Sequence, residues 1–145
     1  AKSDLNQISV LMVCTANYCR SPMAEGILRR KLYVRGLSPQ IRVDSAGTHV
    51  SRKGLKPDLR AQKAVRSAGI DISKLRSRSI RPVDFVEFDY ILVMDESNLQ
   101  SVSKLCPQVP DPYYSNKAGF EQVYTFLEQA ITGLVMTIEE RHSLS

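Results

Sequence analysis

The chain of 145 residues, 43% of them hydrophobic, can bury one core, and we expect a single domain over residues 1–145. No apolar run approaches the ~20 residues that span a bilayer, and the polar start lacks the layout of a signal peptide, so we expect a cytoplasmic protein without a membrane partner. The formal net charge of +5 suits a nucleic-acid binder or an enzyme for phosphorylated substrates, but the basic residues are scattered without interleaved aromatic rings, so we expect no nucleic-acid partner.

The first predicted element is a strand. Residues 8–13 are nearly all apolar, which is typical of a strand buried on both faces, and the run ends at Cys14. A helix follows, because Ser21 offers an N-cap, a proline suits the first helical position, and apolar residues recur at helical spacing until Gly36. The segment between the two is therefore a strand-to-helix loop.

Strands and helices continue to alternate along the chain. Ile41 and Val43 alternate with polar neighbours, which predicts a second strand that leads through residues 44–47 into a loop, and a helix begins at Pro57-Asp58 and ends before Gly69. Residues 90–94 form a third buried strand, and Asp95 can cap a helix that runs to about Leu105. The last helix carries an apolar stripe that faces the core, formed by Phe120, Val123, Tyr124, Leu127, Ile131, Leu134, Val135 and Ile138. The alternation predicts an α/β fold with a doubly wound parallel sheet, whose ligand site lies at the carboxyl ends of the strands.

The loop from Cys14 to Arg20 has the composition of an anion cradle. Its backbone N–H groups and the helix N-terminus attract a phosphate, and the Arg20 guanidinium can hold two phosphate oxygens. The same field favours the ionised form of a thiol, so we expect a nucleophilic Cys14 that accepts a hydrogen bond from Ser21. The residues predicted to bind the phosphate are Thr15, Ala16, Asn17, Tyr18, Cys19 and Ser21.

A phosphate ester of tyrosine also needs a proton donor, because phenolate, with a pKa of ~10, is a poor leaving group. The best candidate is Asp111, which lies on a proline-stiffened turn followed by Tyr113 and Tyr114, whose rings can line an aryl pocket. Local chemistry favours equally an Asx-type turn without a catalytic role.

A zinc site is the main alternative for the cysteines. Cys14 and Cys19 have a spacing that zinc ligands use, but Cys106, His49 and His142 have no matching pair, so we expect no metal and no cofactor.

Taken together, these residues closely resemble the low-molecular-weight protein tyrosine phosphatases. The segments that carry the resemblance are the first strand with its Cys-x5-Arg-Ser loop, residues 44–48, 57–61 and 90–99, and Asp111-Pro112-Tyr113-Tyr114. The resemblance implies a four-stranded parallel sheet in the order 2-1-3-4 with helices on both faces. Its fourth strand is vestigial or missing, because residues 106–110 alone separate the third helix from the aspartate.

The resemblance also implies roles for single residues. Cys14 is the nucleophile that forms a phosphocysteine, Arg20 the phosphate clamp and Asp111 the proton donor, while Asn17 and Ser45 hold the shape of the loop. The substrate it implies is a phosphotyrosine-containing protein, and we expect a monomer or a weak homodimer.

Three residues depart from the family pattern. Ala16 stands where the family usually has glycine, which predicts strain in the loop. Ala68 stands where a histidine often joins the loop network, and Ser51 where an aromatic ring often walls the pocket. Tyr18 can supply such a ring from the other side.

Two other functions remain open at this point. Thioredoxin-coupled arsenate reductases share the loop but need a further cysteine pair, and only Cys106 lies beyond the loop. A non-catalytic phosphotyrosine-binding module would not turn over an aryl phosphate. Finally, Cys14 and Cys19 share one tight loop, which predicts a reversible disulfide that protects the nucleophile.

Overall fold

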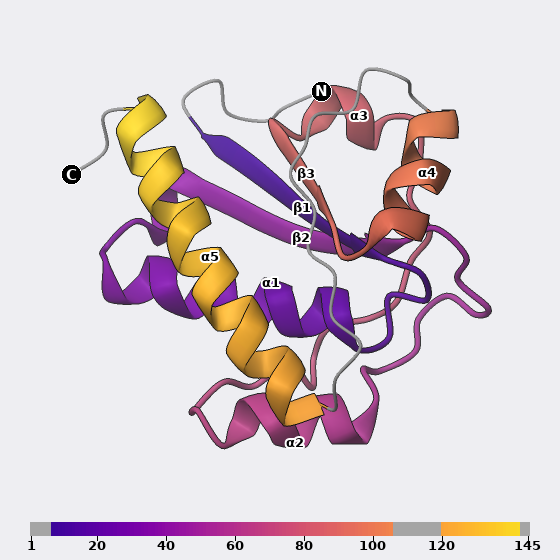
Figure 1. Ribbon diagram of the computed structural model, residues 1–145, viewed down its shortest axis with the longest axis horizontal. Helices are drawn as coiled ribbons and strands as arrows, with labels where there is room; N and C mark the ends of the chain where they lie inside the picture. The colour runs from indigo at the N-terminus through magenta and orange to yellow at the C-terminus, as the bar shows by residue number, and fades with distance from the viewer. Residues whose placement is uncertain (1–6, 106–119, 143–145) are drawn as a thin grey trace.

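A parallel sheet forms the centre of the computed structural model, which describes residues 7–105 and 120–142 (Figure 1). β1 (Ile8–Cys14) lies between β2 (Ile41–Gly47) and β3 (Tyr90–Val93) and pairs with both in parallel. The order β2-β1-β3 confirms the predicted order of the first three strands. The predicted fourth strand falls between the two described ranges and stays a prediction.

Helices cover both faces of the sheet (Figure 1). On one face lie α1 (Arg20–Val34), α2 (Leu59–Arg66) and α5 (Phe120–His142); on the other lie α3 (Asp84–Glu87) and α4 (Glu96–Leu105). A short 3-10 helix, η1 (Ser38–Gln40), precedes β2, and neither it nor α3 was predicted. In the described part of the chain, no helix combines the length and the apolar character that a membrane crossing requires.

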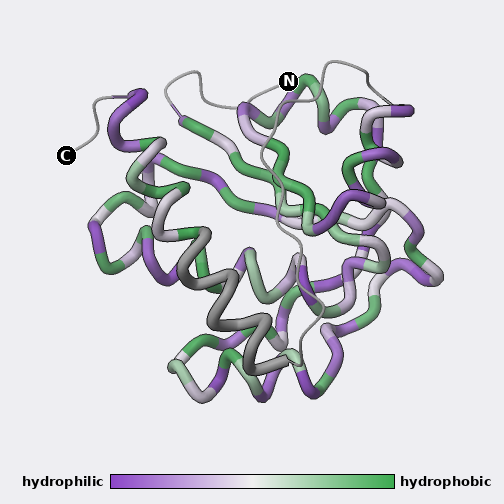
Figure 2. The backbone as a smooth tube through the Cα atoms, viewed as in Figure 1, coloured by the Kyte–Doolittle hydropathy of each residue, from purple (hydrophilic) through white to green (hydrophobic). Residues whose placement is uncertain are grey.

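A hydrophobic core lies on each face of the sheet, and alternate residues of β1 contribute to one or the other. Every residue of β1 is buried. Val10 and Met12 point to the face covered by α1, α2 and α5, whereas Leu11 and Val13 point to the face that includes Val102 of α4. Figure 2 shows the corresponding hydrophobic colour along β1. Because both faces are buried, the central strand is held firmly, and so is the loop that follows it.

The ends of the helices follow the predictions with one correction. Asp58 caps α2 by accepting a hydrogen bond from the backbone two residues on, and Asp95 accepts one at 2.8 Å from the backbone three residues on. Ser21 was predicted to cap α1, which is wrong: the helix begins at Arg20 and Cys19 occupies the cap position without a side-chain hydrogen bond. The Ser21 hydroxyl contacts side chains of the preceding loop instead.

Candidate active site

β1 delivers Cys14 to the carboxyl edge of the sheet, where the loop begins beside the end of β2. Cys14 is opposite Gly47 in the strand register, and Thr48 N donates to the Cys14 carbonyl at 3.0 Å. A Cβ atom on Gly47 would lie 2.6 Å from the Thr15 carbonyl oxygen and 2.9 Å from the Asn17 amide nitrogen. Glycine is therefore required here, because only its missing side chain lets β2 approach the loop backbone so closely.

Asn17 holds the inner conformation of the loop. Its φ of 54° makes it the one non-glycine residue with a left-handed backbone among the described residues. The side chain is almost fully buried: Oδ1 accepts a hydrogen bond from the Arg78 backbone at 2.9 Å, and Nδ2 donates to Ser21 at 2.9 Å and to Ser45 at 3.1 Å. The predicted strain at Ala16 is wrong, since the unusual conformation falls on asparagine, which tolerates it best after glycine.

The predicted nucleophile lies within this network. Cys14 is 2% exposed, and its Sγ lies 3.1 Å from the Ser21 hydroxyl oxygen. Ser21 is fully buried in the first turn of α1, and its hydroxyl contacts Cys14 and Asn17 instead of capping the helix. The expected hydrogen bond between Ser21 and the sulfur is thus present.

Arg20 lies beside the loop, and Asp95 orients its guanidinium. From the sequence, Asp95 was predicted only to cap a helix. Its Nη1 donates to Asp95 Oδ2 at 2.8 Å, and both side chains are about a quarter exposed. Burial alone raises the pKa of Asp95, but hydrogen bonds from the Asn98 backbone and from Arg20 hold that pKa below its ordinary value. The signal was the position of Asp95 two residues after the end of β3, at the same sheet edge as Cys14.

Two charged residues of α1 extend the network and were missed in the sequence analysis. Ser45 Oγ donates to Glu25 Oε1 at 2.7 Å, and Arg29 donates twice to Glu25 Oε2, at 2.9 and 2.6 Å. Glu25 is 1% exposed, and burial raises its pKa. The available signal was the spacing of Ser21, Glu25 and Arg29 by four residues, which places them along one face of a helix.

Other predicted residues lie at the rim or outside the described ranges. Tyr18 is 39% exposed, and its carbonyl accepts a hydrogen bond at 2.8 Å from the Asp58 backbone, so its ring stands at the surface of the loop. Ser51 is exposed in the connection after β2. Asp111, Tyr113 and Cys106 lie outside the described residues, and their roles stay predictions.

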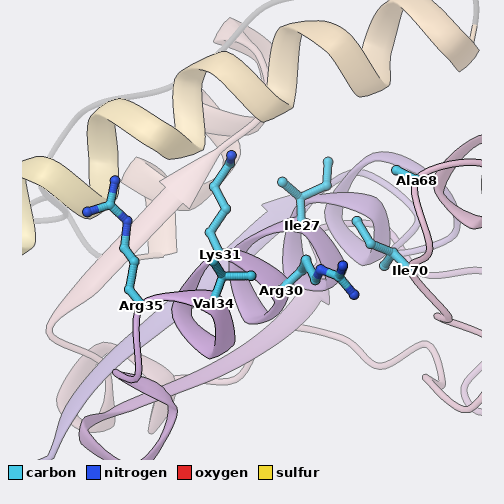
Figure 3. Close-up of a pocket in the computed structure, with 7 residues that line it drawn as sticks. All are labelled: Ile27, Arg30, Lys31, Val34, Arg35, Ala68 and Ile70. Carbon is cyan, nitrogen blue, oxygen red and sulfur yellow. The ribbon is translucent and has the colours of Figure 1, made fainter.

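A separate hollow of about 360 Å³ lies along α1 and contains no residue of the loop (Figure 3). Its walls include Ala68, the residue expected where a histidine often joins the network, together with Arg30, Lys31 and Arg35. Figure 3 shows Lys31 and Arg35 extending from the region of α1 toward α5, and Arg35 pairs with Glu139 at 2.8 Å. Its lining brings no nucleophile near a phosphate cradle, so the hollow is not the reaction site.

No group of three or more His, Cys, Asp and Glu side chains suited to a metal ion occurs within residues 7–105 and 120–142. The two histidines have other contacts. His49 lies 3.0 Å from the Thr48 hydroxyl, and His142 lies 2.9 Å from the Tyr90 hydroxyl at the far end of the molecule.

Comparison with known proteins places this geometry in a family. The family profile described as Low molecular weight phosphotyrosine protein phosphatase matches residues 9–144. A protein of that description from Homo sapiens is 38% identical over 151 residues, covering 84% of this chain and 95% of the human protein. A putative low molecular weight protein-tyrosine-phosphatase from Synechocystis is 36% identical, covering 90% of this chain and 96% of that protein. The solved structure of a protein tyrosine phosphatase from Entamoeba histolytica has a TM-score of 0.82 at 32% identity, covering 92% of this chain and 98% of that one. The chain therefore belongs to the low molecular weight phosphotyrosine protein phosphatase family.

Proposed function

We propose that this protein hydrolyses phosphotyrosine in proteins, and small aryl phosphates, through a phosphocysteine formed on Cys14. The observation that supports this most strongly is the loop itself, which leads directly into a helix N-terminus and in which the Sγ atom of a buried cysteine lies 3.1 Å from a serine hydroxyl oxygen. Arg20 stands at the start of that helix. A thiol, a guanidinium and a row of loop N–H groups together suit attack on a phosphate.

The proposed reaction has two steps. In the first, the Cys14 thiolate attacks phosphorus, the bond between phosphorus and the tyrosine oxygen breaks, and Asp111 gives its proton to that oxygen. In the second, the Asp111 carboxylate takes a proton from water, the water oxygen attacks phosphorus, and the bond from sulfur to phosphorus breaks to release inorganic phosphate. Arg20 and the loop N–H groups stabilise the charge on the phosphoryl oxygens in both steps.

The substrate side of the site combines charge with an aromatic surface. The phosphate is bound by the loop residues Thr15, Ala16, Asn17, Tyr18, Cys19 and Ser21. The rings of Tyr18 and Tyr113 lie beside the phenyl group of the substrate. The proposed reaction needs neither metal nor cofactor, and the site is contained in one domain over residues 1–145. The partner is a phosphotyrosine-containing protein in the cytoplasm.

Arsenate reduction is supported less well. That chemistry relays a disulfide through cysteines beyond the loop, and the chain has three cysteines, two of which belong to the loop. A non-catalytic binding module would not require an acid such as Asp111.

The test is substitution of the nucleophile. Cys14→Ser should reduce turnover of an aryl phosphate below detection while leaving the Kd for inorganic phosphate within about twofold, because a serine hydroxyl is a far weaker nucleophile near neutral pH. Turnover is measured by product absorbance and phosphate binding by calorimetry, with chelator-treated wild type in parallel. Appreciable turnover by the serine variant would mean that Cys14 is not the nucleophile. Loss of activity with chelator would indicate instead that the cysteines bind zinc.

A further inference from the structure

A continuous chain of buried hydrogen bonds connects the sulfur of Cys14 with a carboxylate on α1. From the sulfur it passes through the Ser21 hydroxyl, the Asn17 amide and the Ser45 hydroxyl to Glu25 Oε1, with distances of 3.1, 2.9, 3.1 and 2.7 Å. None of these five side chains belongs to a residue more than 4% exposed. Water therefore does not replace these contacts, and each donor depends on its neighbours.

The directions of the hydrogen bonds in this chain follow from the contact that Asn17, in the middle of the chain, makes with the Arg78 backbone. The Arg78 backbone N–H can only donate, so the Asn17 atom that receives it at 2.9 Å is the amide oxygen. The Asn17 NH2 group consequently donates to both serines. Ser45 must then donate its own hydrogen to Glu25. The Ser21 oxygen already accepts a hydrogen bond from Asn17, so the Ser21 hydrogen is available to the sulfur.

Geometry favours the sulfur as the acceptor of that last hydrogen. The Ser21 oxygen lies 3.1 Å from Cys14 Sγ but 3.4 Å from the Ala46 carbonyl, which is a long distance for an O–H···O contact. A thiolate is also the stronger acceptor of the two, since hydrogen bonds to charged groups are the stronger ones.

Glu25 suits this chain only as a carboxylate. Oε1 accepts a hydrogen bond from Ser45, and Oε2 accepts two from N–H groups of Arg29, so all three of these contacts come from donors. Burial raises the pKa of Glu25, as does the nearby Asp44 of β2, while Ser45 and Arg29 act in the opposite direction. Arg29 is itself held in place, because its Nη2 also donates to the Val43 carbonyl at 2.7 Å.

We propose that Glu25 is a positioning residue for the nucleophile: its charge, held by Arg29, accepts the hydrogen of Ser45. Ser45 thereby stays an acceptor for the Asn17 amide, which the Arg78 N–H also orients, and Ser21 is left to donate to the Cys14 sulfur. This inference rests on the proposed role of Cys14. The sulfur is the nucleophile in the first step and the leaving group in the second, so a donor on it favours both the ionised thiol and its departure. Glu25 touches neither substrate nor sulfur and acts only through the side chains between them.

Glu25→Gln tests the charge with little change of shape. Two donors of Arg29 attract the amide oxygen of the variant, so its NH2 group turns to Ser45. The Ser45 hydroxyl then faces two donors and has no acceptor for its own hydrogen, which weakens its hold on Asn17. We expect kcat for an aryl phosphate to fall about tenfold with KM changed less than about twofold.

A second readout does not depend on turnover. Alkylation of Cys14 by the neutral reagent iodoacetamide, followed by mass spectrometry of its peptide, reports how much of the thiol is ionised at each pH. For Glu25→Gln we expect the rise in the alkylation rate to move to higher pH. The matched control is Glu139→Gln, which removes the charge of another Glu–Arg pair, with Arg35, on α5 and should leave both readouts unchanged.

Action through Ser45 is tested by combining substitutions. If Glu25 works through this chain, Glu25→Gln should change kcat and the alkylation profile of a Ser45→Ala protein by less than about twofold, although it changes those of the wild type. Equal effects in both backgrounds would overturn the proposal, as would an unchanged alkylation profile in Glu25→Gln. Thermal unfolding of each variant verifies that it is folded, and the assays are run well below its midpoint.

Failure of this inference is distinguishable from failure of the proposed function. If Cys14→Ser is inactive while Glu25→Gln behaves like Glu139→Gln, only the positioning role is lost. If Cys14→Ser retains turnover, the proposed function itself is wrong.

Discussion

At the scale of single residues, the proposed reaction divides its chemistry between Cys14, which forms the bond to phosphorus, and Asp111, which supplies the proton. Only the second contribution depends on the leaving group. Phenolate with a pKa of ~10 needs a proton as it leaves, whereas a nitrophenolate of much lower pKa does not.

Asp111→Asn should therefore slow hydrolysis of phosphotyrosine by about 100-fold or more and that of a nitrophenyl phosphate far less. The wild type should also lose kcat on phosphotyrosine as pH rises and the acid ionises, which gives a mildly acidic optimum that the variant lacks. Steady-state kinetics on both substrates from pH 5 to about 8 measure this. Equal losses on the two substrates would make Asp111 a structural turn residue.

Gly47 is a residue whose importance comes from space rather than chemistry. Gly47→Ala would press a methyl group against the Thr15 carbonyl and the Asn17 amide, both backbone atoms that move only with the loop. We expect a loss of about 1–3 kcal/mol in the free energy of unfolding and a fall in kcat, because the loop must shift.

The control for this substitution is Gly133→Ala in α5, where nothing lies within 4 Å of the added Cβ. It should be neutral or stabilising by about 0.5–1 kcal/mol, since alanine favours a helix more than glycine does. Urea unfolding compares the two. Similar behaviour of both variants would contradict the close approach of β2 to the loop.

At the scale of the element, the loop from Cys14 to Arg20 carries two thiols in different environments. Cys14 is buried next to Ser21, while Cys19 is partly buried, packs against the core, and has a pKa raised by burial and by the nearby Cys14. Peroxide would oxidise the Cys14 thiolate to a sulfenic acid, and the Cys19 thiolate would attack that sulfur and release water to form a disulfide.

We predict that dithiothreitol restores most of the activity of peroxide-treated wild type and much less of that of Cys19→Ser. Disulfide formation should quicken as pH rises, because the raised pKa keeps Cys19 protonated at neutral pH and only its thiolate attacks. Peptide mass spectrometry detects the Cys14–Cys19 link. Equal recovery of the two proteins would mean that Cys19 only fills space behind the loop.

At the scale of the whole molecule, an ion-pair cluster connects three parts of the chain. These are β2, the segment between α2 and α3, and α3 itself. Arg78 donates to Asp44 of β2 and, at 3.0 and 3.2 Å, to the fully buried Asp84, while its backbone N–H supports Asn17. Burial by itself raises the pKa of Asp84, but hydrogen bonds from Arg78 and the Arg81 backbone hold it below its ordinary value.

The stability that Asp84 contributes should depend on pH in a defined direction. A lowered pKa means that the folded protein binds fewer protons than the unfolded chain between the folded and ordinary values, so this contribution is complete above about pH 4 and is lost as pH falls through the folded pKa. Asp84→Asn should cost about 2 kcal/mol at pH 7, because it weakens hydrogen bonds to a charged group. The difference from wild type should shrink below about pH 4.

Urea unfolding at several pH values measures both quantities, with Glu140→Gln as an exposed control that should match wild type throughout. A difference between Asp84→Asn and wild type that stayed constant with pH would mean that the ion pairs of Asp84 contribute nothing, and that the substitution acts through packing alone.

Much of the fold and part of the site could be predicted from local patterns. The apolar runs of β1 and β3, the caps at Asp58 and Asp95, and a loop that begins with Cys14 and ends at Arg20 are all visible within a few residues of chain. Local periodicity and capping chemistry depend on neighbours in sequence, so these features did not need the structure.

Contacts between distant residues were decided only by the tertiary structure. The left-handed residue of the loop is Asn17 rather than Ala16 because the backbone of Arg78, 61 residues away, holds the asparagine amide. Ser21 serves the sulfur instead of capping a helix, and Glu25 reaches the loop only because β2 brings Ser45 between them. The side chains in such a buried network find their partners on strands and helices that are distant in sequence and packed side by side. Buried polar groups must form hydrogen bonds with one another, but sequence spacing does not specify which of them the packing brings together.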